Sequence, residues 1–321
     1  MNFKTISDLN LIINKNIHKI PRDIDLIVGI PRSGLLVANL FSLYLNLPLT
    51  DIDSLLEGRI LGVGKTKEKS GWIKSIEEAR KILLVEDSSL SGASLLEAKE
   101  KLKNFKYKDK IIFLTIYVTE ETSKISDIYF EKVESPRIFE WNCFQNKNLE
   151  NACIDIDGVL CVDPTEEEND DGDNYKKFIR NAKLRIKPDI FLGTLVTSRL
   201  EKYREDTEYW LHKNKIEYKN LIMLNLKTKE ERLKRGCHGN FKGENYKRIK
   251  KANIFIESEP SQAEEIARIS GKAVFCTGNQ KFYPENYKNK MKEKAKYKIK
   301  KLLPLKIKKI IKILIFRGEK I

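Results

Sequence analysis

The sequence lacks several features that define common classes of protein. It has five cysteines, none of them in CxxC spacing, and three histidines, which disfavours a secreted disulfide scaffold, a zinc ribbon and a His-rich metal site. No run approaches the roughly 18 apolar residues that a membrane span needs, and the first ten residues contain no apolar signal-peptide core. We therefore expect a cytoplasmic protein that does not cross a membrane.

The length and composition indicate a folded chain of two domains. The 321 residues exceed one ordinary domain, since domains have roughly 100–200 residues. A hydrophobic fraction of 41% and an aromatic fraction of 9% are enough to build cores, which excludes a disordered chain.

The positive charge is concentrated at the C-terminal end. The chain has 61 Lys and Arg against 46 Asp and Glu, a net charge of +15. Residues 286–321 hold fourteen Lys or Arg and two Glu, a net charge of +12, so residues 1–285 carry only +3. The total charge alone would indicate a nucleic-acid partner, but this distribution makes nucleic acid unlikely as the partner of the whole protein.

Within this tail, residues 302–316 have the pattern of a basic amphipathic helix. A helical wheel gathers five apolar side chains on one face and places lysines around the other. The five are Leu303, Ile307, Ile310, Ile311 and Leu314. We expect this helix to lie on an anionic membrane surface, which would place the protein at the inner face of the membrane. A helix packed on its own domain and a basic arm on RNA are the alternatives.

The first 140 residues alternate strand-like and helix-like segments. Apolar runs at residues 25–30, 81–85 and 110–118 predict buried parallel strands, and helical spacing follows the first two. Residues 57–71 are rich in Gly and Lys and predict a mobile loop. This alternation predicts a parallel sheet flanked by helices.

Residues 82–94, ILLVEDSSLSGAS, contain the chemistry of this domain. Glu86 and Asp87 end an apolar run, and a turn rich in serine with Gly92 opens a helix. Backbone N–H groups and hydroxyls at a helix N-terminus form a phosphate cradle. The two acids suit the vicinal hydroxyls of a sugar, directly or through Mg²⁺. Together they predict a sugar-phosphate ligand.

This segment resembles the signature of the type I phosphoribosyltransferases, which use phosphoribosyl pyrophosphate (PRPP). The resemblance implies that Glu86 and Asp87 bind the ribose and that the following loop binds the 5-phosphate. It also implies a pyrophosphate loop at Pro31–Gly34, with Arg32 as a clamp, and a flexible loop at residues 57–75. The residues implied to bind PRPP are Arg32, Ser33, Gly34, Glu86, Asp87, Ser88, Ser89, Ser91, Gly92 and Ser94, with Arg59, Lys65 and Lys67 in the flexible loop.

The match has departures. Glu86 stands where the family usually has Asp, and serines stand where it usually has threonines. These changes keep the chemistry but leave the preferred acceptor open. A generic Rossmann-like phosphate turn and a regulatory PRPP-binding domain are alternatives, although a generic turn does not need both carboxylates.

A second domain is expected over residues 152–280, after a linker at 141–151. The strand-like run at 152–156 ends in Asp155-Ile156-Asp157-Gly158, and carboxylates two residues apart can converge at a strand end. Two such acids make a Mg²⁺ site or a nucleophile–acid pair. Later strand-like runs end in hydroxyls or acids: Thr197 and Ser198, then Glu257 and Glu259.

This series resembles the haloacid dehalogenase (HAD) superfamily, most of whose members are phosphatases. The resemblance implies that Asp155 is the nucleophile and Asp157 the general acid and base. Thr197, Ser198 and Lys242 would bind phosphate, with Lys247 as the competing lysine. Asp155, Asp157, Glu257 and Glu259 would hold Mg²⁺, and Glu257 stands where Asp is usual.

The two resemblances predict two Rossmann-like parallel-sheet α/β domains, at 1–140 and 152–280, and a basic tail at 281–321. We expect a PRPP-dependent phosphoribosyltransferase whose phosphatase domain removes the 5-phosphate and leaves a ribofuranosyl unit. A membrane-associated glycan or lipid-linked sugar is favoured as acceptor over a nucleobase. A soluble nucleobase or orotate transferase fused to a nucleotidase, and a PRPP-sensing protein, are the alternatives. A homodimer is expected from the family alone.

Overall fold

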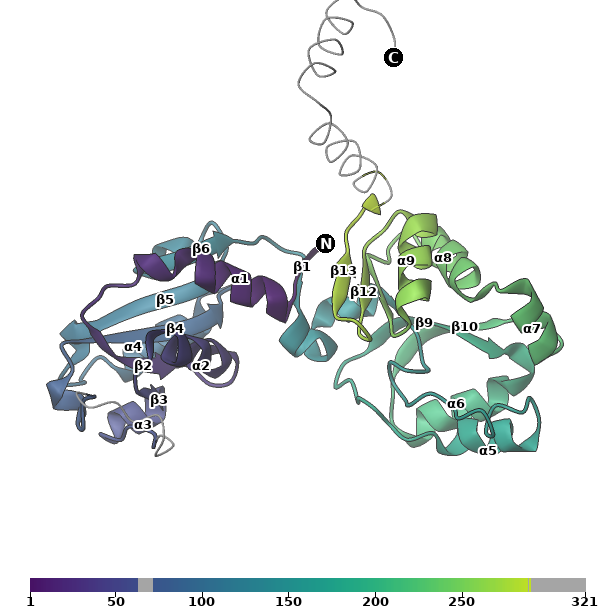
Figure 1. The fold of residues 1–321 in the computed structure, drawn as a ribbon, viewed down its shortest axis with the longest axis horizontal. Helices are drawn as coiled ribbons and strands as arrows, with labels where there is room; N and C mark the ends of the chain where they lie inside the picture. Colours follow the sequence, from purple (N-terminus) through teal and green to yellow (C-terminus); the bar gives the residue numbers. More distant parts are fainter. Residues whose placement is uncertain (63–71, 288, 290–321) are drawn as a thin grey trace, which may run out of the picture. The chain divides into compact units, whose positions relative to one another are not determined.

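The computed structural model describes residues 1–62, 72–287 and 289 (Figure 1). Contacts divide the chain into two compact units, Asn2–Cys143 and Phe144–Ile321 with Met1. The division falls inside the segment expected to be a linker. Each unit is built around a mainly parallel sheet with helices, so the predicted α/β class is confirmed.

The elements of the first unit, in chain order, are β1 (Asn2–Lys4), α1 (Ile6–Asn16), β2 (Ile24–Gly29), α2 (Ser33–Leu45), β3 (Leu49–Asp51), α3 (Ile52–Leu56), β4 (Lys81–Ser88), α4 (Ala93–Lys101), β5 (Ile111–Val118), β6 (Ile128–Lys132) and β7 (Arg137–Phe139). The strands expected at 25–30, 81–85 and 110–118 are β2, β4 and β5. The main sheet has the order β3-β2-β4-β5-β6 and is parallel throughout. β1 and β7 form a separate parallel pair.

Helices cover both faces of this sheet. Along β4, Leu83 and Val85 pack with α1 and α2, whereas Ile82 and Leu84 pack with α3 and α4. Because successive side chains of a strand point to opposite faces, a strand buried on both faces is apolar throughout. This explains why β4 could be recognised as a continuous apolar run.

The elements of the second unit are β8 (Ala152–Ile154), α5 (Asp173–Asn181), β9 (Leu192–Leu200), α6 (Arg204–Lys213), β10 (Tyr218–Leu224), α7 (Lys229–Arg235), α8 (His238–Arg248), β11 (Ile254–Glu257), α9 (Pro260–Ser270), β12 (Val274–Cys276) and β13 (Lys281–Tyr283). Its sheet has the order β10-β9-β8-β11-β12-β13, in which only the β12–β13 pair is antiparallel. In Figure 1, α8 and α9 lie on one side of this sheet, and α5 and α6 lie on the other.

The segment expected to be an irregular linker is more ordered than its sequence predicts. It begins just after β7, and it consists largely of short 3₁₀ segments, Glu140–Gln145 and Lys147–Asn151. Leu149 is fully buried. The pattern was missed because a three-residue strand and 3₁₀ turns have no measurable period.

All five cysteines are free thiols. Cys143, Cys153, Cys161 and Cys276 are buried, and Cys237 is partly exposed at the start of α8. Burial raises the pKa of Cys143 and of Cys153 to about 12. The chain is therefore not stabilised by disulfides, as its cysteine spacing predicts.

In the described part of the chain, no helix combines the length and the apolar character needed to cross a membrane. The predicted basic helix at 302–316 lies outside the described residues, as do Lys65 and Lys67 of the predicted flexible loop.

Candidate functional site

The first candidate site lies where the strand order of the first unit reverses. β3 lies on one side of β2, and the chain then crosses to β4 on the other side. In open parallel sheets, ligands bind at the carboxyl ends of the two strands at such a point. The predicted pyrophosphate loop follows β2, and the predicted ribose-binding acids end β4. The topology therefore brings together the two segments on which the PRPP prediction depends.

Gly34 permits a close approach between these two segments. A Cβ atom at Gly34 would lie 2.8 Å from the Val85 carbonyl oxygen and 3.4 Å from Glu86 Cα. The Ile30 N–H donates to the same Val85 carbonyl at 3.1 Å. The peptide bond between Pro31 and Arg32 is cis, and the Arg32 side chain is exposed. The loop is thus fixed against β4 while Arg32 faces solvent.

Glu86 and Asp87 are both buried, with 6% and 4% of their surface exposed. Burial raises the pKa of both carboxyl groups. The neighbouring Asp87 raises the pKa of Glu86 further, whereas the hydrogen bond with Glu86 opposes the rise at Asp87. Glu86 Oε2 has no hydrogen-bond partner in the described structure, whereas Asp87 Oδ2 accepts the indole N–H of Trp141 at 2.7 Å. Two adjacent buried acids need hydroxyl or cationic partners to be stable as ions. Such a pair suits a ligand rich in hydroxyls.

The predicted phosphate loop follows these acids. Gly92 has a φ of +83° and is the N-cap of α4, a conformation that glycine adopts without strain. The side chains of Ser91 and Ser94 are exposed, that of Ser88 is partly exposed, and that of Ser89 is buried. The Ser89 hydroxyl has no partner among the described residues. Three of the four predicted serines are therefore accessible to solvent.

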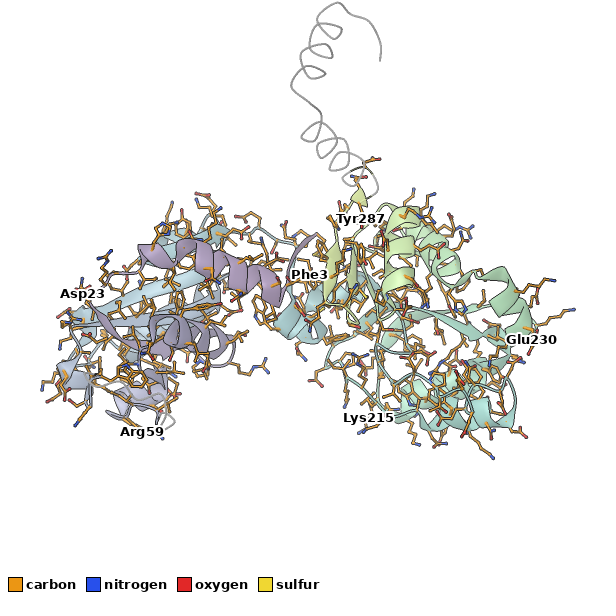
Figure 2. The ribbon with its side chains drawn as sticks, viewed as in Figure 1. Phe3, Asp23, Arg59, Lys215, Glu230 and Tyr287 are labelled. Carbon is orange, nitrogen blue, oxygen red and sulfur yellow. The ribbon has the colours of Figure 1, made fainter. Side chains whose placement is uncertain are left out.

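Ser94 of the phosphate loop and Arg59 of the predicted flexible loop have different surroundings. Ser94 and Pro31 line one cavity of about 170 Å³, together with residues of α3 and α4. Arg59 lies on the surface just after α3 (Figure 2). Its guanidinium donates to Ser54 at 2.9 Å and to Glu57 at 3.1 Å. Its side chain is 61% exposed, so it is free to change partners.

The second candidate site lies at the corresponding point of the second sheet, between β8 and β11. Asp155 directly follows β8, and Glu257 ends β11. Lys242 of α8 lies between them: its Nζ donates to Asp155 Oδ2 at 2.6 Å and to Glu257 Oε2 at 2.8 Å. All three residues are buried. Residues far apart in the sequence thus form one charged cluster, as the HAD resemblance predicts for Asp155, Lys242 and Glu257.

The charges in this cluster affect one another. Burial raises the pKa of Asp155, and the two carboxylates raise the pKa of Lys242 despite its burial. Gln262 also accepts a hydrogen bond from Lys242, at 2.9 Å. The competing lysine, Lys247, is exposed near the end of α8. Of the two lysines, only Lys242 meets the carboxylates.

Asp157 has a partner that the sequence reasoning missed. The fully buried Arg199 of β9 contacts both carboxylate oxygens, with Nη2 2.6 Å from Oδ1 and Nε 3.0 Å from Oδ2. This pairing holds the pKa of Asp157 below its usual range, although burial alone would raise it. Asp157 is therefore held as a carboxylate, and this favours a base over a proton donor. An arginine directly after Thr197-Ser198 was the available sequence signal.

The remaining predicted residues differ in how they face the site. A cavity of about 160 Å³ is lined by Asp155, Asp157, Ser198, Lys242, Glu257 and Glu259, among others. Thr197 is fully buried, and its Oγ1 accepts the Arg199 N–H at 3.2 Å, so Ser198 is the hydroxyl residue at the cavity. Glu259 caps α9 by accepting the Ser261 N–H at 3.1 Å.

The carboxylates have the right chemistry for Mg²⁺, which prefers oxygen ligands and often takes only one or two carboxylates while keeping waters. Asp155 and Glu257 offer such a pair at the cavity. Within the described ranges, no three His, Cys, Asp or Glu side chains are grouped so that they could hold a metal ion. The predicted four-carboxylate set is therefore not preformed, because Arg199 holds Asp157 and α9 holds Glu259.

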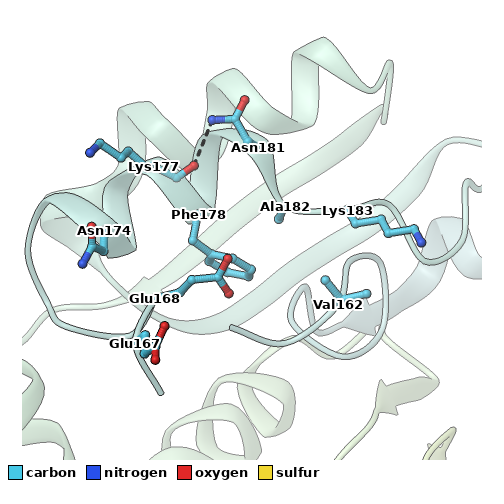
Figure 3. Close-up of a pocket in the computed structure, with 9 residues that line it drawn as sticks. All are labelled: Val162, Glu167, Glu168, Asn174, Lys177, Phe178, Asn181, Ala182 and Lys183. Atoms are coloured by element: carbon cyan, nitrogen blue, oxygen red, sulfur yellow. Dashed lines mark hydrogen bonds between the residues drawn. The ribbon is translucent and has the colours of Figure 1, made fainter. Parts of the chain in front are cut away.

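A larger cavity of about 580 Å³ lies beside α5 (Figure 3). Phe178 and Ala182 line its apolar part, and Glu167, Lys177 and Lys183 are among its charged residues. It has the loop after Val162 and the start of α5 in common with the 160 Å³ cavity, since Asp163 and Tyr175 line the smaller one. It contains no predicted site residue.

Comparisons with known proteins concern the first unit. Residues 3–147 match the family model of the phosphoribosyl transferase domain. The match includes Pro31–Gly34 and residues 82–94, and it ends before β8. A search of curated proteins finds no match.

Solved structures similar to this chain include three phosphoribosyltransferases. A purine phosphoribosyltransferase from Pyrococcus horikoshii has 21% identity and a TM-score of 0.32, covering 43% of this chain and 92% of that one. A Helicobacter pylori xanthine-guanine-hypoxanthine phosphoribosyltransferase has 15% identity and a TM-score of 0.32, covering 44% and 91%. An orotate phosphoribosyltransferase from Aeropyrum pernix has 17% identity and a TM-score of 0.26, covering 39% and 68%. At such low scores and identities, these likenesses support no functional conclusion.

Proposed function

We propose, from the phosphoribosyltransferase domain over residues 3–147, that the first unit transfers a 5-phosphoribosyl group from PRPP to an acceptor and releases pyrophosphate. One observation carries this proposal. The buried pair Glu86 and Asp87 lies directly against the Pro31–Gly34 loop, at the point where Gly34 approaches the Glu86 backbone. A sugar diol and a neighbouring pyrophosphate need that combination.

In this proposal, Glu86 and Asp87 bind the ribose hydroxyls. Ser88, Ser91 and Ser94, around the Gly92 turn, bind the 5-phosphate at the N-terminus of α4. Arg32, together with Ser33, meets the pyrophosphate, since a guanidinium can make two parallel contacts with it. Arg59, Lys65 and Lys67 would place positive charge beside the pyrophosphate leaving group.

We further propose that the second unit is a HAD-type phosphatase that removes the 5-phosphate of the transferred group. The proposal is supported by the cluster of Asp155, Lys242 and Glu257 at the β8–β11 switch point. Asp155 would attack phosphorus, while the ammonium group of Lys242 offsets the negative charge of the carboxylates and the phosphoryl group. Asp157, held ionised by Arg199, would serve as the base that takes a proton from the attacking water, and the leaving oxygen would take its proton from solvent.

Mg²⁺ is the cofactor that this proposal requires. Asp155 and Glu257 would hold it in the 160 Å³ cavity, and bound Mg²⁺ would neutralise phosphoryl charge there. In the first unit Mg²⁺ would accompany PRPP.

Together the two steps transfer ribose. After the phosphate is removed, pyrophosphate can no longer reverse the first step. We propose a membrane-associated glycan or lipid-linked sugar as the acceptor, because the basic tail provides a means of reaching an anionic membrane surface.

The test is to incubate the protein with PRPP and Mg²⁺, offer glycan acceptors and nucleobases in turn, and follow pyrophosphate and phosphate separately. Pyrophosphate should appear first and phosphate second, from a glycan product. Asp155→Asn should stop at the phosphorylated product, whereas Asp87→Asn should abolish the first step. Phosphate released without preceding acceptor transfer would contradict the coupled reaction, and transfer to a free base would identify a nucleobase enzyme.

A further inference from the structure

Trp141 contacts one of the two buried acids of the first site from a segment that the sequence marked only as a linker. Its indole N–H donates to Asp87 Oδ2 at 2.7 Å, although the two residues are 54 positions apart. Trp141 lies in the 3₁₀ segment that follows β7, and β7 pairs with β1 at the start of the chain. The contact therefore joins the end of the unit to the end of β4.

An aromatic stack holds the indole in place. The Trp141 ring lies 4.9 Å from the Phe139 ring at an interplanar angle of 21°, and 6.3 Å from the Tyr117 ring at 24°. Tyr117 is fully buried on β5, the strand next to β4, and stacks on Phe139 at 5.3 Å. Stacked rings supported by a strand leave the N–H little freedom to point elsewhere.

The hydrogen bond from Trp141 reaches one of the two acids and leaves the other without it. Asp87 receives the indole N–H, whereas Glu86 Oε2 has no hydrogen-bond partner in the described structure. A hydrogen bond to the charged form of an acid favours that form, so the contact favours a carboxylate at Asp87 and a proton on Glu86. Burial raises the pKa of both acids; at Asp87 the hydrogen bonds with Glu86 and Trp141 oppose this rise, whereas at Glu86 the neighbouring Asp87 adds to it.

Other charged groups act on Asp87 without replacing this contact. Arg137 of β7 is buried, donates to the Val133 carbonyl at 3.0 Å and attracts Asp87 electrostatically. Lys4 of β1 lies over the Tyr117 ring and is paired with Glu131 of β6 at 2.6 Å. Ser88 Oγ is 3.4 Å from Asp87 Oδ2, at the edge of hydrogen-bond range. Of these described contacts, the hydrogen bond from the Trp141 indole to Asp87 is the shorter one, at 2.7 Å against 3.4 Å for Ser88.

We propose that Trp141 is a positioning residue that orients the sugar-binding carboxylate of Asp87 and favours its ionised form. The inference that this matters for PRPP rests on the proposed function, but the contact itself can be tested without any ligand.

The ligand-free test uses the indole N–H resonances of the three tryptophans of the full chain. Trp141→Phe keeps the stacking and removes the donor, and the signal that disappears identifies Trp141. We expect that signal to move as the acids titrate in the wild-type protein and to stay fixed in Asp87→Asn. A Trp141 signal that does not respond to Asp87→Asn would overturn the proposal.

The second test measures PRPP affinity by calorimetry in Mg²⁺ buffer across a pH series. Trp141→Phe should weaken binding roughly 10- to 100-fold, the range expected for losing a hydrogen bond to a charged group. Its loss of affinity on acidification should begin at higher pH, because the carboxylate of Asp87 is then protonated more readily. In the Asp87→Asn background, Trp141→Phe should have no further effect.

Tyr107→Phe is the matched control, because it also removes a donor to a carboxylate, that of Glu77, on the surface of the same unit. It should leave PRPP affinity and its pH dependence unchanged. Wild-type affinity and pH dependence in Trp141→Phe would overturn the positioning role alone. Failure of the wild-type protein to bind PRPP would overturn the proposed function and, with it, the link to PRPP, while the resonance test still decides the contact.

Discussion

At the scale of single residues, the second unit buries several charges within one small region. Asp155, Glu257, Lys242 and Arg199 are each at most 4% exposed. A buried ion is costly unless opposite charges and hydrogen bonds surround it, and removing one partner leaves the other unpaired. Lys242 pairs with two of these acids, whereas Arg199 pairs with one. The loss of Lys242 should therefore destabilise the fold more than the loss of Arg199.

Lys242→Met should therefore lower the free energy of unfolding by about 3–5 kcal/mol near neutral pH. The sign of its pH dependence follows from Asp155, whose folded-state pKa already lies above its usual value and should rise further without the ammonium. A folded state that binds the extra proton loses stability as the pH rises through this interval. Denaturant unfolding at pH 5 and pH 8 should show a larger loss at pH 8.

Lys247→Met is the control, since Lys247 lies exposed on the same helix. It should change stability by no more than about 0.5 kcal/mol. Equal stabilities of Lys242→Met and the wild-type protein at pH 8 would show that the ammonium does not compensate the acids.

The sequence predicted the acids of both sites better than their partners. Glu86, Asp87 and Asp155 could be found because polar residues that end apolar runs are conspicuous. Arg199 and Trp141 were not found, because neither resemblance includes them and each meets its acid across the fold: Arg199 is 42 residues from Asp157, and Trp141 is 54 residues from Asp87. The sequence did contain a signal for each partner: Arg199 is a charged residue at the end of a strand-like run, and Trp141 is a large aromatic residue within a polar linker.

At the scale of elements, the close approach of α2 to β4 makes Gly34 a test of the first site. Gly34→Ala would place a Cβ 2.8 Å from the Val85 carbonyl oxygen, which is backbone and cannot rotate away. We expect a loss of about 1–3 kcal/mol in unfolding free energy, typical of overpacking. Because α2 must move away from Glu86, PRPP affinity measured by calorimetry should also fall.

Asn39→Ala on the exposed side of α2 is the comparison, and we expect it to leave PRPP affinity unchanged. Unaltered affinity in Gly34→Ala would mean that the loop need not lie against β4 to bind PRPP.

The central strands of both sheets were predicted within a few residues, whereas the edges were not. β4 and β9 are buried along most of their length, and each contains a visible apolar run. β1, β7 and β13 have three residues each, too few for alternation to be distinguished from chance. β10 is exposed along its first half and carries polar residues there.

At the scale of the whole molecule, charge and chemistry are separated along the chain. Both candidate sites lie before residue 286, in a part with net charge +3, and residues 286–321 carry +12. If the tail serves only to bind an anionic surface, its deletion should remove that binding without affecting turnover.

Deletion of 286–321 should abolish sedimentation with vesicles that contain anionic lipid and leave reaction with soluble substrates unchanged. The wild-type protein should detach as salt is raised, because the attraction is electrostatic. Persistent vesicle binding by the truncated chain would place the membrane contact elsewhere.

The thiols described above give the native chain a single attachment point. Four of the five cysteines are buried, which leaves Cys237 as the position open to a thiol-reactive dye. Cys237 immediately precedes α8, the helix that presents Lys242 to the acids. A fluorophore there would need no engineered cysteine, and we expect its emission to change when a ligand occupies the 160 Å³ cavity that Lys242 lines.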